Sequence, residues 1–141
     1  MLLAVSDQAP ELNLTEYPEE YQLHAAVVLA PVTDFAPIRE GGSIVAWMGK
    51  TMEEAPDAWQ LASPNTHISD QSPPILFIHS SADRVVPFQQ SLSAIELMGK
   101  KGAHAELILL AGAPHPFWNY VEWFGDTMDQ AAAFFHKQFS L

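Results

Sequence analysis

Hydrophobic residues gather in three continuous runs, and polar or turn-forming residues follow each run. The runs lie at 23–30, 75–78 and 106–110. Short continuous apolar runs are typical of strands that are buried on both faces of a parallel sheet. We therefore predict about three parallel strands.

Apolar residues recur at helical intervals in the segments between and after these runs. The segments 41–61, 88–101 and 119–139 show this pattern, and Pro56 starts or kinks a second helix within the first of them. The apolar start at 1–6 also favours a short helix. Strands that alternate with helices predict βαβ units with right-handed crossovers. We expect one α/β domain over residues 1–141, because no repeat or linker divides the chain.

Composition narrows the classes of function. The 141 residues carry 6 Lys+Arg against 17 Asp+Glu, a formal net charge of −11. This acidity argues against a nucleic-acid partner, which requires clustered basic residues. The absence of cysteine excludes disulfides, thiolate metal sites and a cysteine nucleophile. No apolar run approaches the roughly 18 residues of a membrane span, so we expect no membrane partner, and the compartment stays open.

Two titratable side chains follow neighbouring predicted strands. Asp83 lies in the turn after the run at 75–78, and His115 lies in the loop after the run at 106–110. Loops at the carboxyl ends of parallel strands form the ligand crevice. A carboxylate at this position can hold an imidazole in one tautomer, which leaves the other ring nitrogen to take a proton from a nucleophile. The alternative is that Asp83 caps the next helix or pairs with Arg84, and that His115 is an ordinary loop residue.

Metal and cofactor sites find little support in the sequence. His79 and Asp83 form an H-x-x-x-D array, but it falls at a strand end rather than on one helix face. There is no H-E-x-x-H motif or Cys/His cluster, and no glycine-rich phosphate loop. We predict neither a metal nor a cofactor.

An aromatic cluster after His115 has two interpretations. It either lines a substrate pocket, with Phe117 and Trp118 as binding residues, or packs under the last helix. Asp34, at the end of the first strand, either contributes to the pocket edge or caps its own loop. The cluster contains Phe117, Trp118, Tyr120, Trp123 and Phe124.

Three segments together resemble the C-terminal half of α/β-hydrolase esterases, in particular the acetyl-xylan-esterase and carboxylesterase-like enzymes. The resemblance implies a partial α/β-hydrolase sheet, with Asp83 as the catalytic acid, His115 as the catalytic histidine and a small helical cap at about 38–62. The segments are Ser63-Pro64 to His67, SPPILFIHSSADRVVPFQQS and AELILLAGAPHPFW.

The chain departs from this pattern in two ways. The glycine that usually follows the strand-ending histidine is Ser80 here. The family's G-x-S-x-G nucleophile turn and H-G-G-type oxyanion loop are both missing from the sequence. On this resemblance, residues 1–6 are the tail of the helix that follows the nucleophile. We expect the chain to supply the triad acid and histidine of a serine esterase for short-chain carboxylic esters, including acetylated sugars, and to be inactive alone.

A second interpretation is a non-catalytic α/β-hydrolase remnant or association module. In the hydrolase sheet order, the strand at 23–30 lies beside the strand that carries the nucleophile. Without that neighbour it is an apolar edge with unpaired backbone groups. We therefore predict a homo-oligomer or domain swap through 23–30, or pairing with a complementing N-terminal half.

Overall fold

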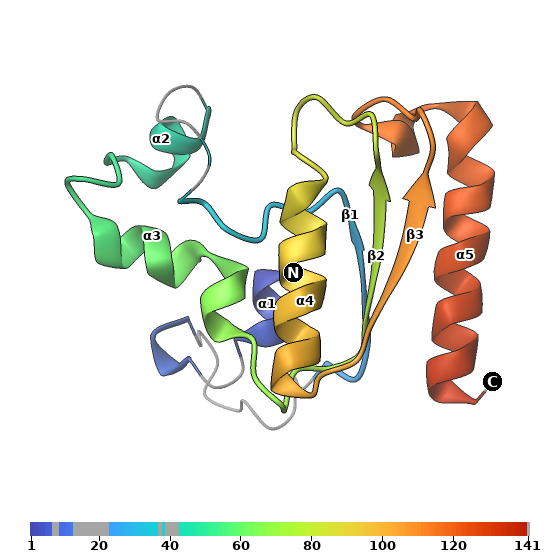
Figure 1. The fold of residues 1–141 in the computed structure, drawn as a ribbon, viewed down its shortest axis with the longest axis horizontal. Coiled ribbons are helices and arrows are strands. Elements are labelled where there is room, and N and C mark those ends of the chain that lie inside the picture. Colours follow the sequence, from blue (N-terminus) through green and yellow to red (C-terminus); the bar gives the residue numbers. More distant parts are fainter. Residues whose placement is uncertain (7–8, 13–22, 37, 39–42, 141) are drawn as a thin grey trace.

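A computed structural model describes residues 1–6, 9–12, 23–36, 38 and 43–140, and its centre is a parallel sheet (Figure 1). The strands are β1 (Ala26–Leu29), β2 (Ile75–Ser80) and β3 (Ala105–Leu110), in the order β1-β2-β3. Both pairings are parallel. The predicted α/β class with three parallel strands is confirmed.

Two hydrophobic clusters cover the two faces of the sheet, because side chains alternate along each strand. Ile75 and Phe77 of β2 pack with Met98 on one face. Leu76 and Ile78 pack with Phe134 on the other. All six residues of β2 are buried, which explains the continuous apolar run at its first four positions.

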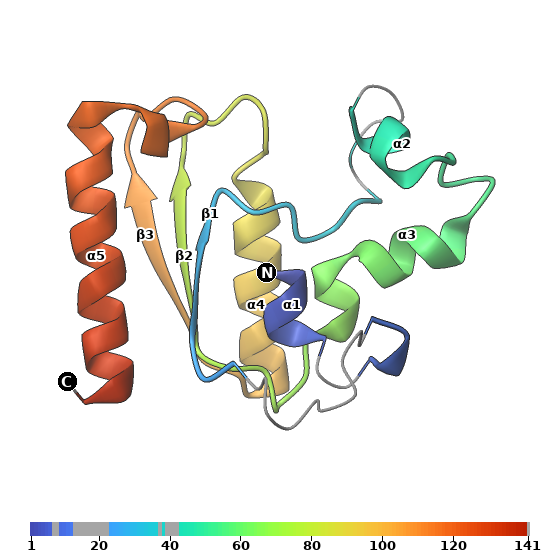
Figure 2. The same cartoon turned by 180° about the vertical axis from the view of Figure 1, so that it is seen from behind.

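Helices lie on both faces of this sheet (Figure 2). The first cluster joins α1 (Leu2–Val5) and α4 (Gln89–Lys101) to the sheet, and the second joins α5 (Val121–Phe139). Helix α4 ends at Gly102, whose φ of +81° is in the left-handed region that glycine adopts without strain. Among the described helices, none has the length and apolar character needed to cross a membrane.

The segment predicted to be a cap contains two helices among its described residues, which agrees with the second helix predicted at Pro56. These are α2 (Ser43–Met48) and α3 (Pro56–Ala62), and Pro56 occupies the first turn of α3, as expected for a helix start. They lie to one side of the sheet (Figure 1). Trp59 of α3 is buried, and its indole N–H donates to the Lys50 carbonyl at 3.0 Å. A cap function for this segment stays a prediction.

Short 3-10 turns complete the described elements. They are η1 (Pro10–Leu12), η3 (Pro64–His67) and η4 (Phe117–Asn119). The last of these occupies the start of the segment predicted as the final helix, so α5 begins at Val121 rather than at 119.

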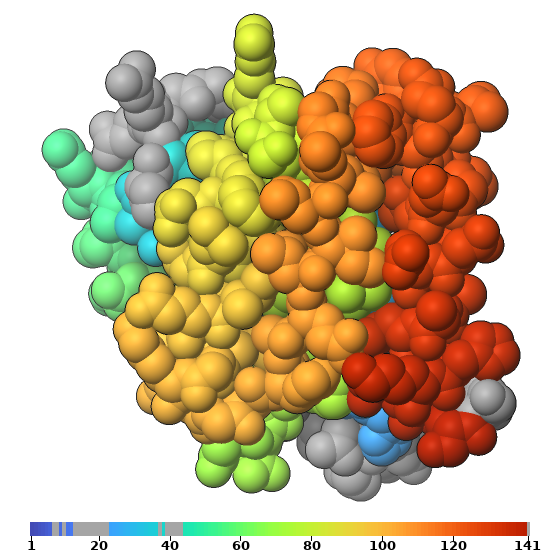
Figure 3. All heavy atoms as spheres, turned by 45° about the vertical axis from the view of Figure 1, so that its right-hand side comes forward, coloured from blue at the N-terminus to red at the C-terminus, as the bar shows by residue number. Residues whose placement is uncertain are grey.

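The two outer strands differ from β2 in exposure. Figure 3 shows β3 at the surface between α4 and α5. Its residues Leu107 and Leu109 are 37% and 50% exposed. Strand β1 is the other edge, and it pairs with β2 through the register Val28↔Phe77.

Candidate active site

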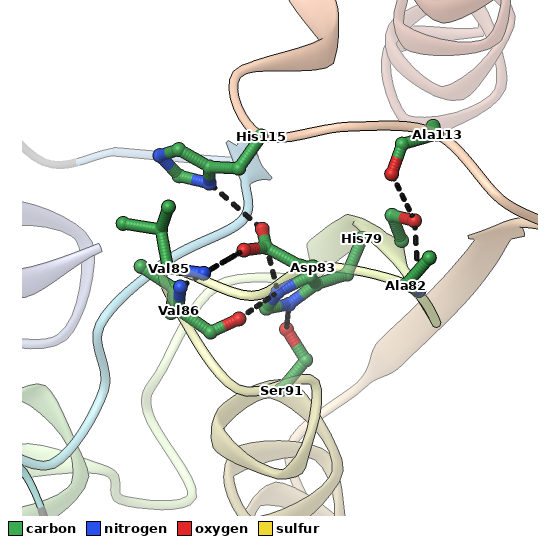
Figure 4. A network of polar contacts seen from close by, with 9 residues as sticks. His79, Ala82, Asp83, Val85, Val86, Ser91, Ala113 and His115 are labelled. Carbon is green, nitrogen blue, oxygen red and sulfur yellow. Dashed lines mark hydrogen bonds and ion pairs between the residues drawn. The ribbon is translucent and has the colours of Figure 1, made fainter.

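Asp83 and His115 meet above the carboxyl ends of β2 and β3 (Figure 4). The distance between His115 Nδ1 and Asp83 Oδ2 is 2.7 Å. The Asp83 side chain is fully buried and that of His115 is 18% exposed. Residues that are 32 positions apart are thus brought together by one helix and one strand.

Backbone groups hold the Asp83 carboxylate in place. Its Oδ1 accepts hydrogen bonds from the N–H groups of Val85 at 2.8 Å and Val86 at 2.9 Å. Burial by itself raises the pKa of Asp83, but the hydrogen bonds from His115, Val86 and Val85 outweigh it, and the pKa lies below its usual value. The carboxylate is therefore ionised at neutral pH. Asp83 pairs with His79 and His115 rather than with Arg84, the partner that the sequence left open.

A second histidine supports the acid from the opposite side (Figure 4). His79 is fully buried, with Nε2 at 3.1 Å from the Val86 carbonyl oxygen and Nδ1 at 2.7 Å from Ser91 Oγ. A carbonyl can only accept, so Nε2 carries the proton and Nδ1 accepts from the Ser91 hydroxyl. Its Nε2 also lies 3.5 Å from Asp83 Oδ2. Burial lowers the pKa of His79, which keeps the ring neutral.

This role of His79 was missed by sequence reasoning, which considered the residue only as a metal ligand with Asp83. Both of its ring nitrogens are occupied by protein groups. Within the described residues, no group of three His, Cys, Asp or Glu side chains could hold a metal ion. The available signal was Ser91, a buried polar residue in the first turn of α4.

The aromatic residues after His115 divide between site and core. The Trp118 ring contacts the His115 ring edge to face, with centroids 5.3 Å apart. Phe117, predicted as a substrate-binding residue, is 0% exposed and packs with Leu76 and Ile78. That prediction is wrong, because a side chain inside the core offers no surface to a substrate. Trp118 is half-buried beside His115, so it can contact a substrate.

Asp34 lies in the lining of a surface hollow of about 390 Å³. Its Oδ1 accepts from the Ala36 N–H at 2.9 Å, so the side chain also stabilises its own loop. Asp34 therefore stabilises its own loop and also lines the hollow, and a contact with substrate stays a prediction. The hollow reaches the acid loop at Val85, and its lining residues are Asp34, Ile38, Val85, Pro87, Gln89, Gln90 and Ser93.

Gln90 joins the loop after β1 to the first turn of α4. Its Oε1 accepts from the backbone N–H groups of Thr33 at 2.9 Å and Asp34 at 2.8 Å, and its Nε2 donates to the Asp34 carbonyl at 2.9 Å. The Thr33 hydroxyl also donates to the Gln90 carbonyl at 2.8 Å. Sequence reasoning missed this connection, since nothing local in the sequence pairs residues 56 and 57 positions apart. It fixes one wall of the hollow against the helix that follows Asp83.

The tautomer of His115 follows from its partner. A carboxylate only accepts, so His115 Nδ1 carries the proton, and the Nε2 lone pair is available as a base. Ser80, which ends β2 close to Asp83, does not act as the nucleophile. Ser80 Oγ is buried and donates to the Ala113 carbonyl at 2.6 Å. The arrangement can accept a proton from a hydroxyl brought to Nε2.

The chain is similar in sequence to several known proteins. The BD-FAE family model matches residues 2–98, a range that includes Asp83 and stops before His115. Esterase LipC of Mycobacterium tuberculosis (strain ATCC 25618 / H37Rv) is 33% identical over 69 residues, which are 48% of this chain and 17% of LipC. The non-reducing polyketide synthase Preu3 of Preussia isomera is 31% identical over 84 residues, 53% of this chain and 3% of the synthase.

Solved esterase structures superpose on most of the chain. A truncated form of a carbohydrate esterase from gut microbiota has a TM-score of 0.70 at 29% identity, covering 85% of this chain and 44% of that one. Thermogutta terrifontis Est2 with butyrate bound has a TM-score of 0.67 at 26% identity, covering 91% and 49%. The chain thus spans about half the length of these structures and less than a fifth of the curated relatives.

Proposed function

This chain belongs to the BD-FAE family, and we propose that it supplies the acid and the histidine of a serine esterase's charge relay. The predicted resemblance to the C-terminal half of α/β-hydrolase esterases is confirmed by the family match and the esterase neighbours. The observation that carries the proposal is the 2.7 Å contact between His115 Nδ1 and Asp83 Oδ2.

In the proposed reaction, His115 Nε2 takes the proton of a serine hydroxyl as the serine oxygen attacks the ester carbonyl. The ionised Asp83 holds the imidazole in the required tautomer and stabilises the imidazolium that forms. His115 then gives this proton to the departing alkoxide, which leaves as the alcohol. Water then attacks the carbonyl of the acyl-serine while His115 Nε2 takes its proton, and His115 returns that proton to the serine oxygen as the carboxylic acid leaves.

We propose short-chain carboxylic esters, including acetylated sugars, as substrates. Two neighbours support this class: one is a carbohydrate esterase, and the other was solved with butyrate bound. The hollow beside the acid loop, with Asp34 in its lining and Trp118 next to His115, is the proposed substrate-contacting region.

We propose that the nucleophile comes from outside this sequence, which contains no G-x-S-x-G. The expectation is that the chain alone does not hydrolyse esters. The test compares p-nitrophenyl acetate and butyrate hydrolysis by the chain alone and by the chain supplied with a segment that carries G-x-S-x-G.

A fluorophosphonate probe adds a direct readout in the same experiment. It should label the serine of the added segment and none of the serines of this chain. Hydrolysis by the isolated chain that survives His115→Ala would overturn the assignment.

The proposed site of association is the free side of β1. This strand is apolar and lies at the edge of the described sheet, so its outer backbone groups can pair with another strand. We propose that 23–30 pairs with the nucleophile-bearing segment, and with a second copy through oligomerisation or a domain swap when that segment is absent.

Sedimentation combined with hydrogen exchange tests this association. The amides of β1 that face away from β2, those of Val27 and Leu29, should gain protection with rising protein concentration and, more strongly, on adding the segment. A strict monomer in which these amides are already protected would contradict it. Association without hydrolysis in any combination would instead favour the alternative function, a non-catalytic association module.

A further inference from the structure

Ser80 occupies the last position of β2, opposite Leu110 of β3. In this chain the Ser80 side chain is 0% exposed and lies between the loop that carries Asp83 and the loop that carries His115. A buried hydroxyl at such a position requires partners, because an unsatisfied one is costly.

Both capacities of the Ser80 hydroxyl are used, and each serves a different loop. Its proton is donated to the Ala113 carbonyl at 2.6 Å, two residues before His115. Its oxygen accepts from the Ala82 N–H at 3.0 Å, one residue before Asp83. One oxygen atom therefore joins the turn that aims the carboxylate to the loop that aims the imidazole.

The Ser80–Ala113 hydrogen bond extends the pairing between β2 and β3 beyond the last paired residues of the sheet. The ladder between β2 and β3 ends at Ser80 and Leu110, and the Ser81 N–H adds a bond to the Leu110 carbonyl at 3.3 Å. The Ser80–Ala113 bond comes next, and the Asp83–His115 bond after it. The Ser80 hydroxyl thus takes the place of a backbone hydrogen bond at the point where β2 and β3 leave the regular sheet.

We propose that Ser80 is a positioning residue that sets the distance between Asp83 and His115. Without its hydroxyl, the Ala113 carbonyl and the Ala82 N–H lose a common partner, and the two loops can move apart. The Asp83–His115 bond is then open for a larger fraction of the time. The inference rests on the proposed function only where it treats this bond as catalytic.

The test follows the Nδ1–H proton of His115 by NMR in the chain as it stands. Ser80→Ala removes one oxygen and should accelerate exchange of this proton with water by roughly five- to tenfold. This is the factor that corresponds to the net free energy of one buried hydrogen bond. The exchange rate should move toward that of Asp83→Asn, in which the carboxylate is gone. Ser81→Ala is the matched control, since Ser81 is the exposed neighbouring serine, and its exchange rate should equal that of the unmodified chain.

Urea unfolding of each variant separates local opening from a general loss of stability. A Ser80→Ala variant that is less stable but keeps the original exchange rate would have lost a structural residue only, and the proposal would be overturned. If Ser80→Ala does not fold, Ser80→Cys fills the same space with a weaker donor and should give an intermediate rate. A folded Ser80→Cys variant with unchanged exchange would also overturn the proposal.

A kinetic arm distinguishes this inference from the proposed function. With a nucleophile-bearing segment supplied, Ser80→Ala should lower kcat by a factor similar to its exchange effect and leave KM unchanged. If no combination hydrolyses esters while Ser80→Ala still accelerates exchange, the proposed function fails and the positioning role stands.

Discussion

The two sides of the Asp83 carboxylate are built differently, although each presents a histidine to the same oxygen. On the inner side, His79 is fully buried, and protein groups occupy both of its nitrogens. On the outer side, His115 is 18% exposed and bonded to the protein through Nδ1. A base must exchange protons with a substrate, so partial exposure and an available nitrogen separate the catalytic candidate from the structural one.

Replacing the outer histidine is expected to have the largest effect. In the complemented enzyme, His115→Ala should lower kcat by about 10⁴–10⁶-fold, because the general base is lost. Its unfolding free energy should change by less than about 1 kcal/mol, as for a partly exposed loop side chain. Steady-state kinetics and urea denaturation on the same preparation check both values. A variant with substantial remaining turnover would show that another group takes the proton.

Replacing the inner histidine should lower the stability strongly and the turnover weakly, the reverse of the effect at the outer histidine. His79→Ala leaves a cavity and removes the partner of Ser91, the Val86 carbonyl and Asp83, so we expect a loss of about 2–4 kcal/mol in unfolding free energy. Turnover per folded molecule should fall far less than in His115→Ala. Urea denaturation measures the stability, with His136→Ala, at an exposed position on α5, as the control. Equal stability of these two variants would contradict the structural role.

As the pH falls, the stability linked to His79 should be lost before the stability linked to Asp83. The pKa of His79 is lowered by burial from 6.5, so the unfolded chain binds a proton more readily than the folded one. Stability is therefore complete above about pH 6.5 and decreases as the pH falls below it. Asp83, whose pKa lies below 3.8, adds a second loss below that pH.

Chemical denaturation between pH 3 and 8 follows these two losses. His79→Gln should flatten the upper part of the profile, and Asp83→Asn the lower part. A flat profile from pH 8 to 5 in the unmodified chain would contradict the neutral, buried assignment of His79.

The smallest effect is expected at the ring that contacts the outer histidine. Trp118 packs edge to face on His115 with a centroid distance of 5.3 Å. Aromatic pairs of this kind contribute about 0.5–1.5 kcal/mol, so Trp118→Ala should change turnover by no more than roughly tenfold. Trp118→Phe keeps a ring and serves as the control in the same ester assay. Equal losses in both variants would point to the indole N–H instead of the ring contact.

The features that sequence predicted are those with a local or periodic signal. The first four residues of β2 form a continuous apolar run because both faces of the strand are covered. Asp83 and His115 follow two parallel strands whose carboxyl ends meet at one edge of the sheet. The start of α3 at Pro56 is likewise a local signal.

Contacts between distant loops could not be predicted in this way. Ser80 reaches Ala113 across 33 positions and Gln90 reaches Thr33 across 57, and neither pair has a periodic pattern. Phe117 was misassigned because an aromatic residue near a catalytic loop has the same appearance in sequence whether it faces a pocket or the core. The direction of a single side chain depends on backbone dihedrals that composition does not specify.

The proposed acid and histidine belong to one uninterrupted βαβ unit, β2-α4-β3, and this has an evolutionary consequence. Genetic recombination anywhere before Ile75 transfers both groups together, along with the residues that orient them, and cannot separate acid from base. Half of a catalytic site can therefore be inherited as a single unit and joined to different nucleophile-bearing and cap-bearing segments.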